Sequence, residues 1–177
     1  MANRPRLLSF SLAASLALVL GLASVAAAAP GHRTVQILDN CDPASFNEAL
    51  GDGACVRDGG FTFGKLIEHL LRKGDVASWR FAPEQLKLAA GGTVTAINRG
   101  GEAHTFSPVA EFGGGCIEDI NALLGLTPVA ECADFPVTFL ATLVPPGASI
   151  QTDALAAGTN HFMCLIHPWQ RTTVEAR

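Results

Sequence analysis

The sequence predicts an all-β domain, a β-sandwich or barrel, preceded by a helical segment that is stapled by a disulfide. From Val76 onward, short runs of alternating apolar and polar residues are separated by glycine and proline, a pattern typical of such domains. Before that point one stretch has helical periodicity. The five cysteines stand at spacings that indicate two short disulfide loops and one spare thiol.

The first 29 residues are predicted to be a cleaved signal peptide. Arg4 and Arg6 precede an apolar run over residues 7–25, and small residues follow just before Pro30, which is the order found in secretory signals. An uncleaved membrane anchor is the alternative. Cleavage leaves 148 residues, which is enough for one domain with a hydrophobic core. We expect no stable membrane insertion of the chain after cleavage. We therefore expect a periplasmic or secreted protein.

The charge of this mature chain limits its partners. The removed segment carries two arginines and no acidic residue, so the formal charge changes from −4 to −6. An acidic surface argues against nucleic acid and anionic membranes as partners. It is compatible with a basic partner protein but does not identify one.

The cysteines indicate an oxidising compartment, where exported thiols pair. Neighbours in sequence pair naturally as Cys41–Cys55 and Cys116–Cys132, each closing a short loop near glycine, aspartate and proline. Cys164 is left over. A lone thiol in such a compartment needs protection, which a bound metal supplies; the alternative is a buried and inert cysteine.

Residues 30–76 are expected to form an N-terminal extension with one helix. Residues 34–38 are a short strand or an extended entry arm, and residues 39–60 form a loop in which residues 42–47 allow one helical turn. The helix runs over residues 62–73, where apolar residues recur at helical spacing. Thr62 is a candidate N-cap, Arg72 and Lys73 suit the carbonyl end, and Gly74 ends the helix.

Residues 77–177 are expected to form the β domain. The expected strands share the alternating pattern or lie between turn residues: 77–81, 85–88, 93–98, 103–108, 139–143, 149–152, 161–164 and 172–175. A long loop over residues 109–136, with a short helix at residues 120–124, interrupts them and is stapled by the second disulfide. Long insertions cost little in closure entropy.

The residues that carry chemistry gather near the carboxyl end. Cys164 and His167 stand three residues apart at the end of an apolar run, and Gln170 follows three residues later. His104 lies sixty residues upstream in a strand-like stretch. A thiolate with two imidazoles and a weak axial group is the ligand set of a trigonal copper site. A tight loop between two strands would let Cys164 and His167 bind one metal ion, and His104 would approach from an adjoining strand.

At this point the chain from about residue 77 to 177 resembles the cupredoxin (plastocyanin-like blue copper) family. The resemblance is carried by the strand at 93–98 followed by 102–106, by the turn at 145–147, and by the Cys-x-x-His loop at 162–169, in the short form of amicyanin-like members. The family implies a Greek-key β-sandwich and single-electron transfer. It places His104, Cys164 and His167 on the equatorial ligands of one copper ion per chain.

One position departs from the family pattern. Short-loop members have a methionine three residues after the second histidine, where this chain has Gln170. Met163 is a poor substitute, because alternation along a strand points it away from a metal that Cys164 faces. The axial group is therefore Gln170, a backbone carbonyl, or none. An amide oxygen is harder than a thioether and should lower the reduction potential, as in stellacyanin-like members.

The leading hypothesis is an exported type 1 (blue) copper protein, a monomer that carries single electrons to or from a partner protein. The alternative is a copper-handling or tolerance protein that binds copper without a redox partner. We expect no enzymatic activity, because copper oxidases need further ligands such as His-x-His pairs, and none of the five histidines has another two residues away. A metal-free fold used only for protein binding is the remaining possibility.

Overall fold

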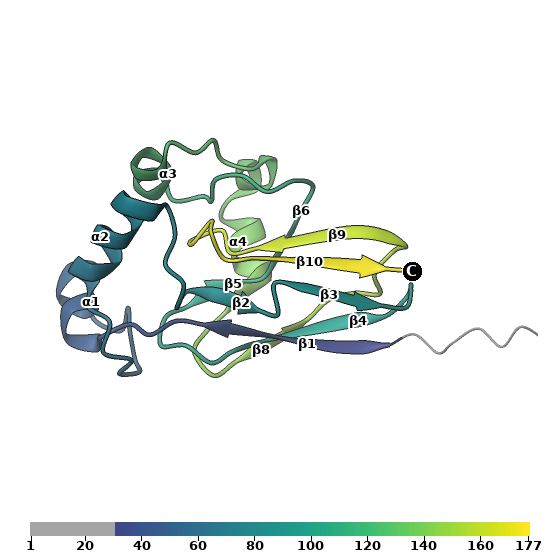
Figure 1. Cartoon of the computed structure of the whole chain (residues 1–177), viewed down its shortest axis with the longest axis horizontal. Helices are drawn as coiled ribbons and strands as arrows, with labels where there is room; N and C mark the ends of the chain where they lie inside the picture. The colour runs from purple at the N-terminus through teal and green to yellow at the C-terminus, as the bar shows by residue number, and fades with distance from the viewer. Residues whose placement is uncertain (1–30) are drawn as a thin grey trace, which may run out of the picture.

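Two four-stranded sheets packed face to face form the centre of the protein in the computed structural model, which describes residues 31–177 (Figure 1). The first sheet has the order β2-β1-β4-β8, and the second has the order β3-β10-β9-β6; β5 and β7 form a small separate pair. The strands are β1 (His32–Leu38), β2 (Arg80–Ala82), β3 (Gln85–Leu88), β4 (Thr93–Asn98), β5 (His104–Thr105), β6 (Ser107–Val109), β7 (Leu143–Val144), β8 (Ser149–Gln151), β9 (Gly158–Met163) and β10 (Arg171–Ala176).

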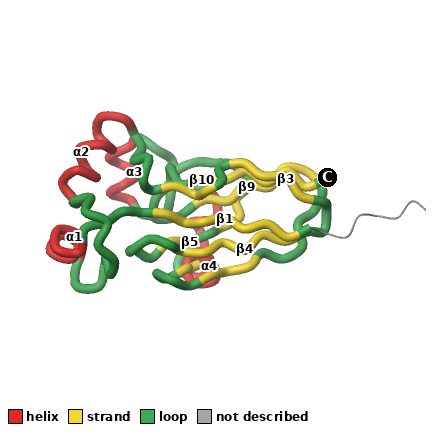
Figure 2. The backbone as a smooth tube through the Cα atoms, turned by 60° about the horizontal axis from the view of Figure 1, so that its bottom comes forward, coloured by secondary structure: helices red, strands yellow, loops and turns green. Residues whose placement is uncertain are grey.

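The predicted β-sandwich is present, but the described chain is only partly all-β, because it has more helix than the single expected helix and short insertion helix. The helices of the described residues are α1 (Pro43–Leu50), α2 (Phe63–Lys73), α3 (Glu118–Leu124) and α4 (Val137–Thr142), with a 3₁₀ turn, η1, at Ala130–Asp134. Figure 2 shows α1, α2 and α3 together at one end of the sandwich, with the C-terminus at the other end. No helix among residues 31–177 is long and apolar enough to cross a membrane. The predicted signal peptide lies outside the described residues.

Strand β1 is an interior strand of the first sheet, although residues 30–76 were expected to lie outside the β domain. It pairs with β4 in parallel and with β2 in antiparallel register. Val35 and Ile37 are fully buried, and their polar neighbours point outward. The strand alternative for residues 34–38 is therefore confirmed, because this alternation buries one face against the opposite sheet. The end of β1 reaches the helical end of the sandwich.

The main core lies between the two sheets. Phe106 stacks on Phe162 with ring centroids 4.6 Å apart, and Phe81 packs beside Phe106 at 5.3 Å. Val94 and Val174 are fully buried in the same cluster. Cys164 belongs to this cluster too, so the predicted ligand lies at the edge of the apolar core.

The N-terminal extension contains two helices, not one. Asp42 caps α1 by accepting a hydrogen bond from the Ser45 amide at 2.9 Å, and Pro43 starts the helix, so the single predicted turn extends to Leu50. Helix α2 is confirmed and ends at Gly74, whose φ of 73° is the left-handed conformation that favours glycine. The predicted Cys41–Cys55 disulfide is also confirmed.

These helices have a core of their own. Trp79 is sandwiched between Phe46 and Phe61, with ring centroids 5.8 Å and 5.3 Å away. Leu66 and Leu70 of α2 are buried in the same cluster, and Trp169 from the β9–β10 loop packs against it. We call this unit the helical cap: α1, α2, the loop between them and Trp79. The cap therefore contacts the loop that carries the predicted ligands.

The insertion after β6 contains α3, η1 and the predicted Cys116–Cys132 disulfide. The short helix expected at residues 120–124 is confirmed as α3. Residues 139–143, expected as a strand, are mostly the end of α4, and only Leu143 belongs to a strand. The hydroxyl of Thr142 donates to the Thr138 carbonyl at 2.8 Å, which is the bond to residue i−4 that a threonine side chain makes within a helix.

Candidate metal centre

Three residues far apart in sequence meet at the helical end of the sandwich. His104 starts β5, Cys164 directly follows β9, and His167 lies in the loop to β10. That loop is tight: the Cys164 amide donates to the Gln170 carbonyl at 3.0 Å, and the Gln170 amide donates to the His167 carbonyl at 2.8 Å. The predicted convergence of a cysteine, a nearby histidine and a distant histidine is therefore present.

The donor atoms form a small triangle. Sγ of Cys164 lies 3.8 Å from Nδ1 of His104 and 3.6 Å from Nδ1 of His167, and the two nitrogens are 3.1 Å apart. A point equidistant from all three lies about 2 Å from each, close to the 2.0–2.3 Å typical of metal bonds to imidazole and thiolate. All three residues are buried. One soft transition-metal ion fits this geometry, and copper suits a Cys-His₂ donor set.

Cys164 is held as a metal-binding thiolate by its neighbours. Burial raises the pKa of its thiol, but hydrogen bonds from His104 and His167 outweigh burial and hold the pKa well below its usual value of 9.0. The Thr105 amide also donates to Sγ at 3.4 Å. These contacts favour the thiolate, which is the form of cysteine that binds a metal ion.

His104 is the positive partner in this metal-free arrangement. Burial lowers the pKa of its imidazole, but hydrogen bonds to Asp39 and Cys164 outweigh burial and raise the pKa to about 10. Its Nε2 lies 2.8 Å from Oδ2 of Asp39, and both side chains are fully buried. The histidine therefore presents Nδ1 to the site and Nε2 to a carboxylate.

Asp39 was not predicted as a site residue, since the sequence placed it in a loop. Burial raises the pKa of its carboxyl, but the hydrogen bonds from His104 and from the backbone amides of Gly101 and Glu102 lower it below 3.8. No local spacing relates Asp39 to His104, which is 65 residues away. An aspartate directly after a buried strand was the one available signal, and it is a weak one.

A second buried carboxylate, Glu102, lies behind His167 and was also missed. Its Oε2 is 3.8 Å from Nε2 of His167 and accepts a hydrogen bond from the Trp79 indole at 2.5 Å. Burial raises the pKa of Glu102, against the lowering effect of His167 and Trp79. Each imidazole of the triangle thus has a buried carboxylate on its far side. The carboxylate of Asp39 is within hydrogen-bond distance of His104, whereas that of Glu102 is farther from His167.

Gln170, the predicted axial group, is fully buried beside the loop. Its Nε2 donates to the Leu38 carbonyl at 3.0 Å, and its Oε1 has no hydrogen-bond partner among residues 31–177. A buried amide oxygen without a partner is costly unless something else contacts it, so this atom fits the role of a weak ligand. Met163 belongs to a different apolar cluster, with Val109 and Leu165, as strand alternation predicted.

Other residues considered from the sequence lie around the site or away from it. Trp169 is half-buried, with its ring edge-on to His167 at 5.3 Å. Arg171 is half-buried; it donates to the Pro168 carbonyl and lies 5.2 Å from the Phe112 ring. His161 also packs on Phe112 and His69 packs on Phe61, so neither belongs to the triangle.

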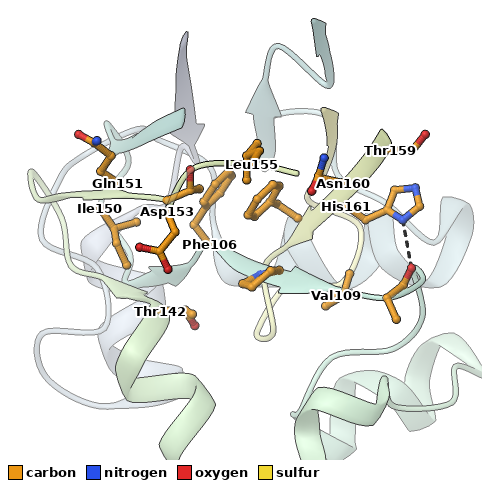
Figure 3. A pocket seen from close by; sticks show the side chains of 14 residues that line it. Phe106, Val109, Thr142, Ile150, Gln151, Asp153, Leu155, Thr159, Asn160 and His161 are labelled. Carbon is orange, nitrogen blue, oxygen red and sulfur yellow. Dashed lines mark hydrogen bonds between the residues drawn. The ribbon is translucent and has the colours of Figure 1, made fainter. Parts of the chain in front are cut away.

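A separate cleft of about 440 Å³ opens between the free edges of the two sheets, at β6 and β8 (Figure 3). Its floor includes Phe106 and Leu155, and Asp153 and His161 lie at its rim. None of the three donor residues lines it. Among residues 31–177, the triangle is the one group of three or more His, Cys, Asp or Glu side chains whose ligand atoms lie within 4.8 Å of one another.

Comparisons with known proteins return likenesses at the level of fold. No protein-family profile and no curated protein sequence matches the chain. A purple cupredoxin from Nitrosopumilus maritimus is 18% identical, with a TM-score of 0.40 over 58% of this chain and 86% of its own. Amicyanin from Paracoccus versutus is 14% identical, with a TM-score of 0.36 over 55% and 73%. Plastocyanin from Dryopteris crassirhizoma is 17% identical, with a TM-score of 0.35 over 56% and 89%.

Each of these structures belongs to the cupredoxin class that the sequence resembles. Likenesses with TM-scores this low do not identify a function, which has to come from the geometry of the site itself.

Proposed function

We propose that this chain is an exported type 1 copper protein that binds one copper ion and carries single electrons. The observation that supports it is the triangle of Cys164, His104 and His167, whose donor atoms lie within 4.8 Å of one another in a buried setting. A copper ion bound there would supply one-electron redox chemistry, as in other sites of this ligand type.

The residues of this chain would supply a constant geometry. His104 and Cys164 are fully buried and His167 nearly so, so a bound ion would be shielded from water and its donors would be held by the surrounding packing. Gln170 would be the axial ligand through Oε1. The two disulfides suit an oxidising compartment, which supports a periplasmic or secreted location. We further propose a monomer with a Greek-key sandwich, a redox partner protein and no catalytic activity.

Copper loading with a ligand variant tests this function. The wild-type chain should bind one copper ion and show a strong visible thiolate-to-copper absorption band. Cys164→Ser should abolish the band, because the sulfur is the donor of that transition. His161→Gln, a histidine outside the triangle, should keep both the band and the stoichiometry. A band that survives in Cys164→Ser, or a wild-type chain that takes up no copper, would refute the proposal.

A copper-handling role without a redox partner is the second candidate. It is favoured by the burial of His167, whose side chain is 5% exposed, because a buried ligand edge slows electron exchange with other proteins. Electron self-exchange measured by NMR line broadening separates the two functions. Slow exchange with tight Cu(II) binding supports copper handling, whereas fast exchange supports the electron carrier.

A further inference from the structure

The end of β1 contacts the metal centre from outside the triangle. Asp39 is the residue after β1, and its Oδ2 lies 2.8 Å from Nε2 of His104. Both side chains are fully buried, so no water replaces or screens this contact. A hydrogen bond to a carboxylate in such a setting is stronger than one between neutral groups.

Asp39 is itself rigidly held. Its Oδ1 accepts hydrogen bonds from the amides of Cys41 at 3.2 Å and Gly101 at 2.9 Å, and its Oδ2 also accepts one from the Glu102 amide at 3.1 Å. A Cβ at Gly100 would overlap the carboxylate, so the glycine turn after β4 is shaped to receive it. The orientation of the Asp39 side chain is therefore built into the fold.

The residue before Asp39 contacts the same centre. The Leu38 carbonyl accepts the hydrogen bond from Nε2 of Gln170 at 3.0 Å. One dipeptide at the end of β1 thus holds an equatorial imidazole through a side chain and the candidate axial amide through its backbone. This strand belongs to the part of the chain before residue 77, which the family resemblance does not cover.

We propose that Asp39 is a positioning residue for the metal centre: it holds the His104 ring with Nδ1 toward the metal and stabilises Cu(II) relative to Cu(I). The inference rests on the proposed copper function. A carboxylate that accepts the Nε2 proton fixes the tautomer and makes the imidazole a stronger donor. A stronger donor favours the more highly charged ion, so Asp39 lowers the reduction potential of the site.

A purely structural role for Asp39 makes a different prediction. If the carboxylate only organised the three backbone amides, its loss would lower stability and leave the relative affinity for the two copper states unchanged. The reduction potential therefore distinguishes the two roles, and so does the state of the His104 ring in NMR spectra.

The test compares two variants that disturb Asp39 with two matched controls. Asp39→Asn removes the charge, and Gly100→Ala displaces the carboxylate without changing it. Asp42→Asn removes a nearby charge that caps α1 and does not touch the site. Gly64→Ala adds a methyl group in α2 where nothing lies within 4 Å. Potentials are measured on the copper-loaded proteins, and Zn(II) affinity is measured by competition with a chelator.

Both Asp39→Asn and Gly100→Ala should weaken Cu(II) relative to Cu(I) by about 10-fold to 100-fold, the usual effect of removing such a partner. At 59 mV per tenfold change for one electron, the potential should rise by about 60–120 mV. Zn(II) affinity should fall by a similar factor in both variants. The two controls should show neither change.

A wild-type potential in both Asp39→Asn and Gly100→Ala would overturn the inference while leaving the copper function intact. The Zn(II) measurement separates the positioning role from the copper function. If the wild-type chain does not carry electrons on copper, but Asp39→Asn and Gly100→Ala still lose Zn(II) affinity, the positioning role is supported and the copper function is not. Should both variants fail to fold, ¹⁵N-histidine spectra of the wild-type Zn(II) form decide: a slowly exchanging Nε2 proton on His104 supports the inference, and an Nδ1 tautomer overturns it.

Discussion

Cys164 and His104 set each other's protonation in the metal-free protein. Burial opposes both shifts, but hydrogen bonds from His104 and His167 hold the thiol pKa well below its usual value, and hydrogen bonds to Asp39 and Cys164 raise the imidazole pKa to about 10. A metal ion needs the thiolate and the neutral imidazole. The lowered thiol pKa favours the first of these requirements before the metal binds.

Metal binding should therefore release about one proton per ion at pH 8, from Nδ1 of His104. Because the folded pKa of His104 is raised, the proton is present below pH 10, and its release should fade as pH rises through about 10. Calorimetry of Zn(II) binding in buffers of different ionisation enthalpy measures this number. His161→Gln should behave like wild type, whereas release of two protons at pH 8 would show that Cys164 begins as a thiol.

Gln170 sets the second residue-scale prediction. Its buried Oε1 lacks a hydrogen-bond partner in the part of the chain that the structure describes, so we expect it to contact the metal as a hard axial donor. Gln170→Met places a softer thioether there, which favours Cu(I) and should raise the potential by about 60–120 mV, one to two tenfold steps. Cyclic voltammetry is the measurement, and Gln85→Met at an exposed position is the control. An unchanged potential would exclude Gln170 as a ligand.

At the scale of elements, the two disulfides fasten the segments on either side of the site. Cys41–Cys55 closes the loop that begins beside Asp39, and Cys116–Cys132 closes the insertion. The Cys116 amide donates to the Leu165 carbonyl at 2.7 Å, next to Cys164. The separations in sequence, 14 and 16 residues, are similar, so the two bridges should contribute similarly to stability.

Replacing either cysteine pair by serine should lower the free energy of unfolding by about 3 kcal/mol, since each bridge restricts a short loop of the unfolded chain. Urea unfolding of the metal-free variants measures the loss. Thiol titration of the denatured wild-type chain without reductant should find one thiol, Cys164. Losses that differ between the pairs by more than about 2 kcal/mol would contradict the loop-closure account.

Strands and helices near the site show where local patterns fail. Residues 139–142 include one aromatic and one β-branched side chain, Phe139 and Thr142, but form the end of α4, since Phe139 packs against Phe135 of the preceding turn at 5.2 Å. Tertiary contacts override a weak propensity in so short a segment. Helix α2 was predicted well because eleven residues with a clear apolar stripe and a glycine stop leave little ambiguity.

At the scale of the whole molecule, the metal centre joins parts that are separate in sequence. His104 comes from β5, while Cys164 and His167 come from the loop between β9 and β10. The helical cap covers this end through Trp79 and Trp169. A metal ion held by both segments binds the folded chain and not the unfolded one, so it must stabilise the fold.

Saturating metal should therefore raise the melting temperature. With free Zn(II) at about a thousand times its dissociation constant, the stabilisation is about 4 kcal/mol. Differential scanning calorimetry with and without Zn(II) measures it. Cys164→Ser and His104→Ala should lose most of the shift, whereas His69→Gln, on α2, should retain it. An equal shift in all of these variants would show that the ion binds elsewhere.

The sequence by itself indicated Cys164 and His167 as candidate donors, both disulfide pairs, helix α2 and most strands of the sandwich. Those signals are local: a Cys-x-x-His spacing, alternation with period two, a helical stripe ended by glycine, and cysteines close enough to pair. Turns, strand alternation, helix formation and short disulfide loops depend on residues that are close along the chain, and the sequence shows these residues directly.

Only the tertiary structure decided what surrounds the donors. Asp39 meets His104 across 65 residues, and Glu102 reaches Trp79 and His167 because the end of β1, the turn after β4 and the helical cap come together at one end of the sandwich. The parallel pairing of β1 with β4 brings Asp39 there. Contacts of this kind depend on the packing of distant segments. The residues next to a carboxylate in the sequence do not indicate which histidine it will contact in the fold.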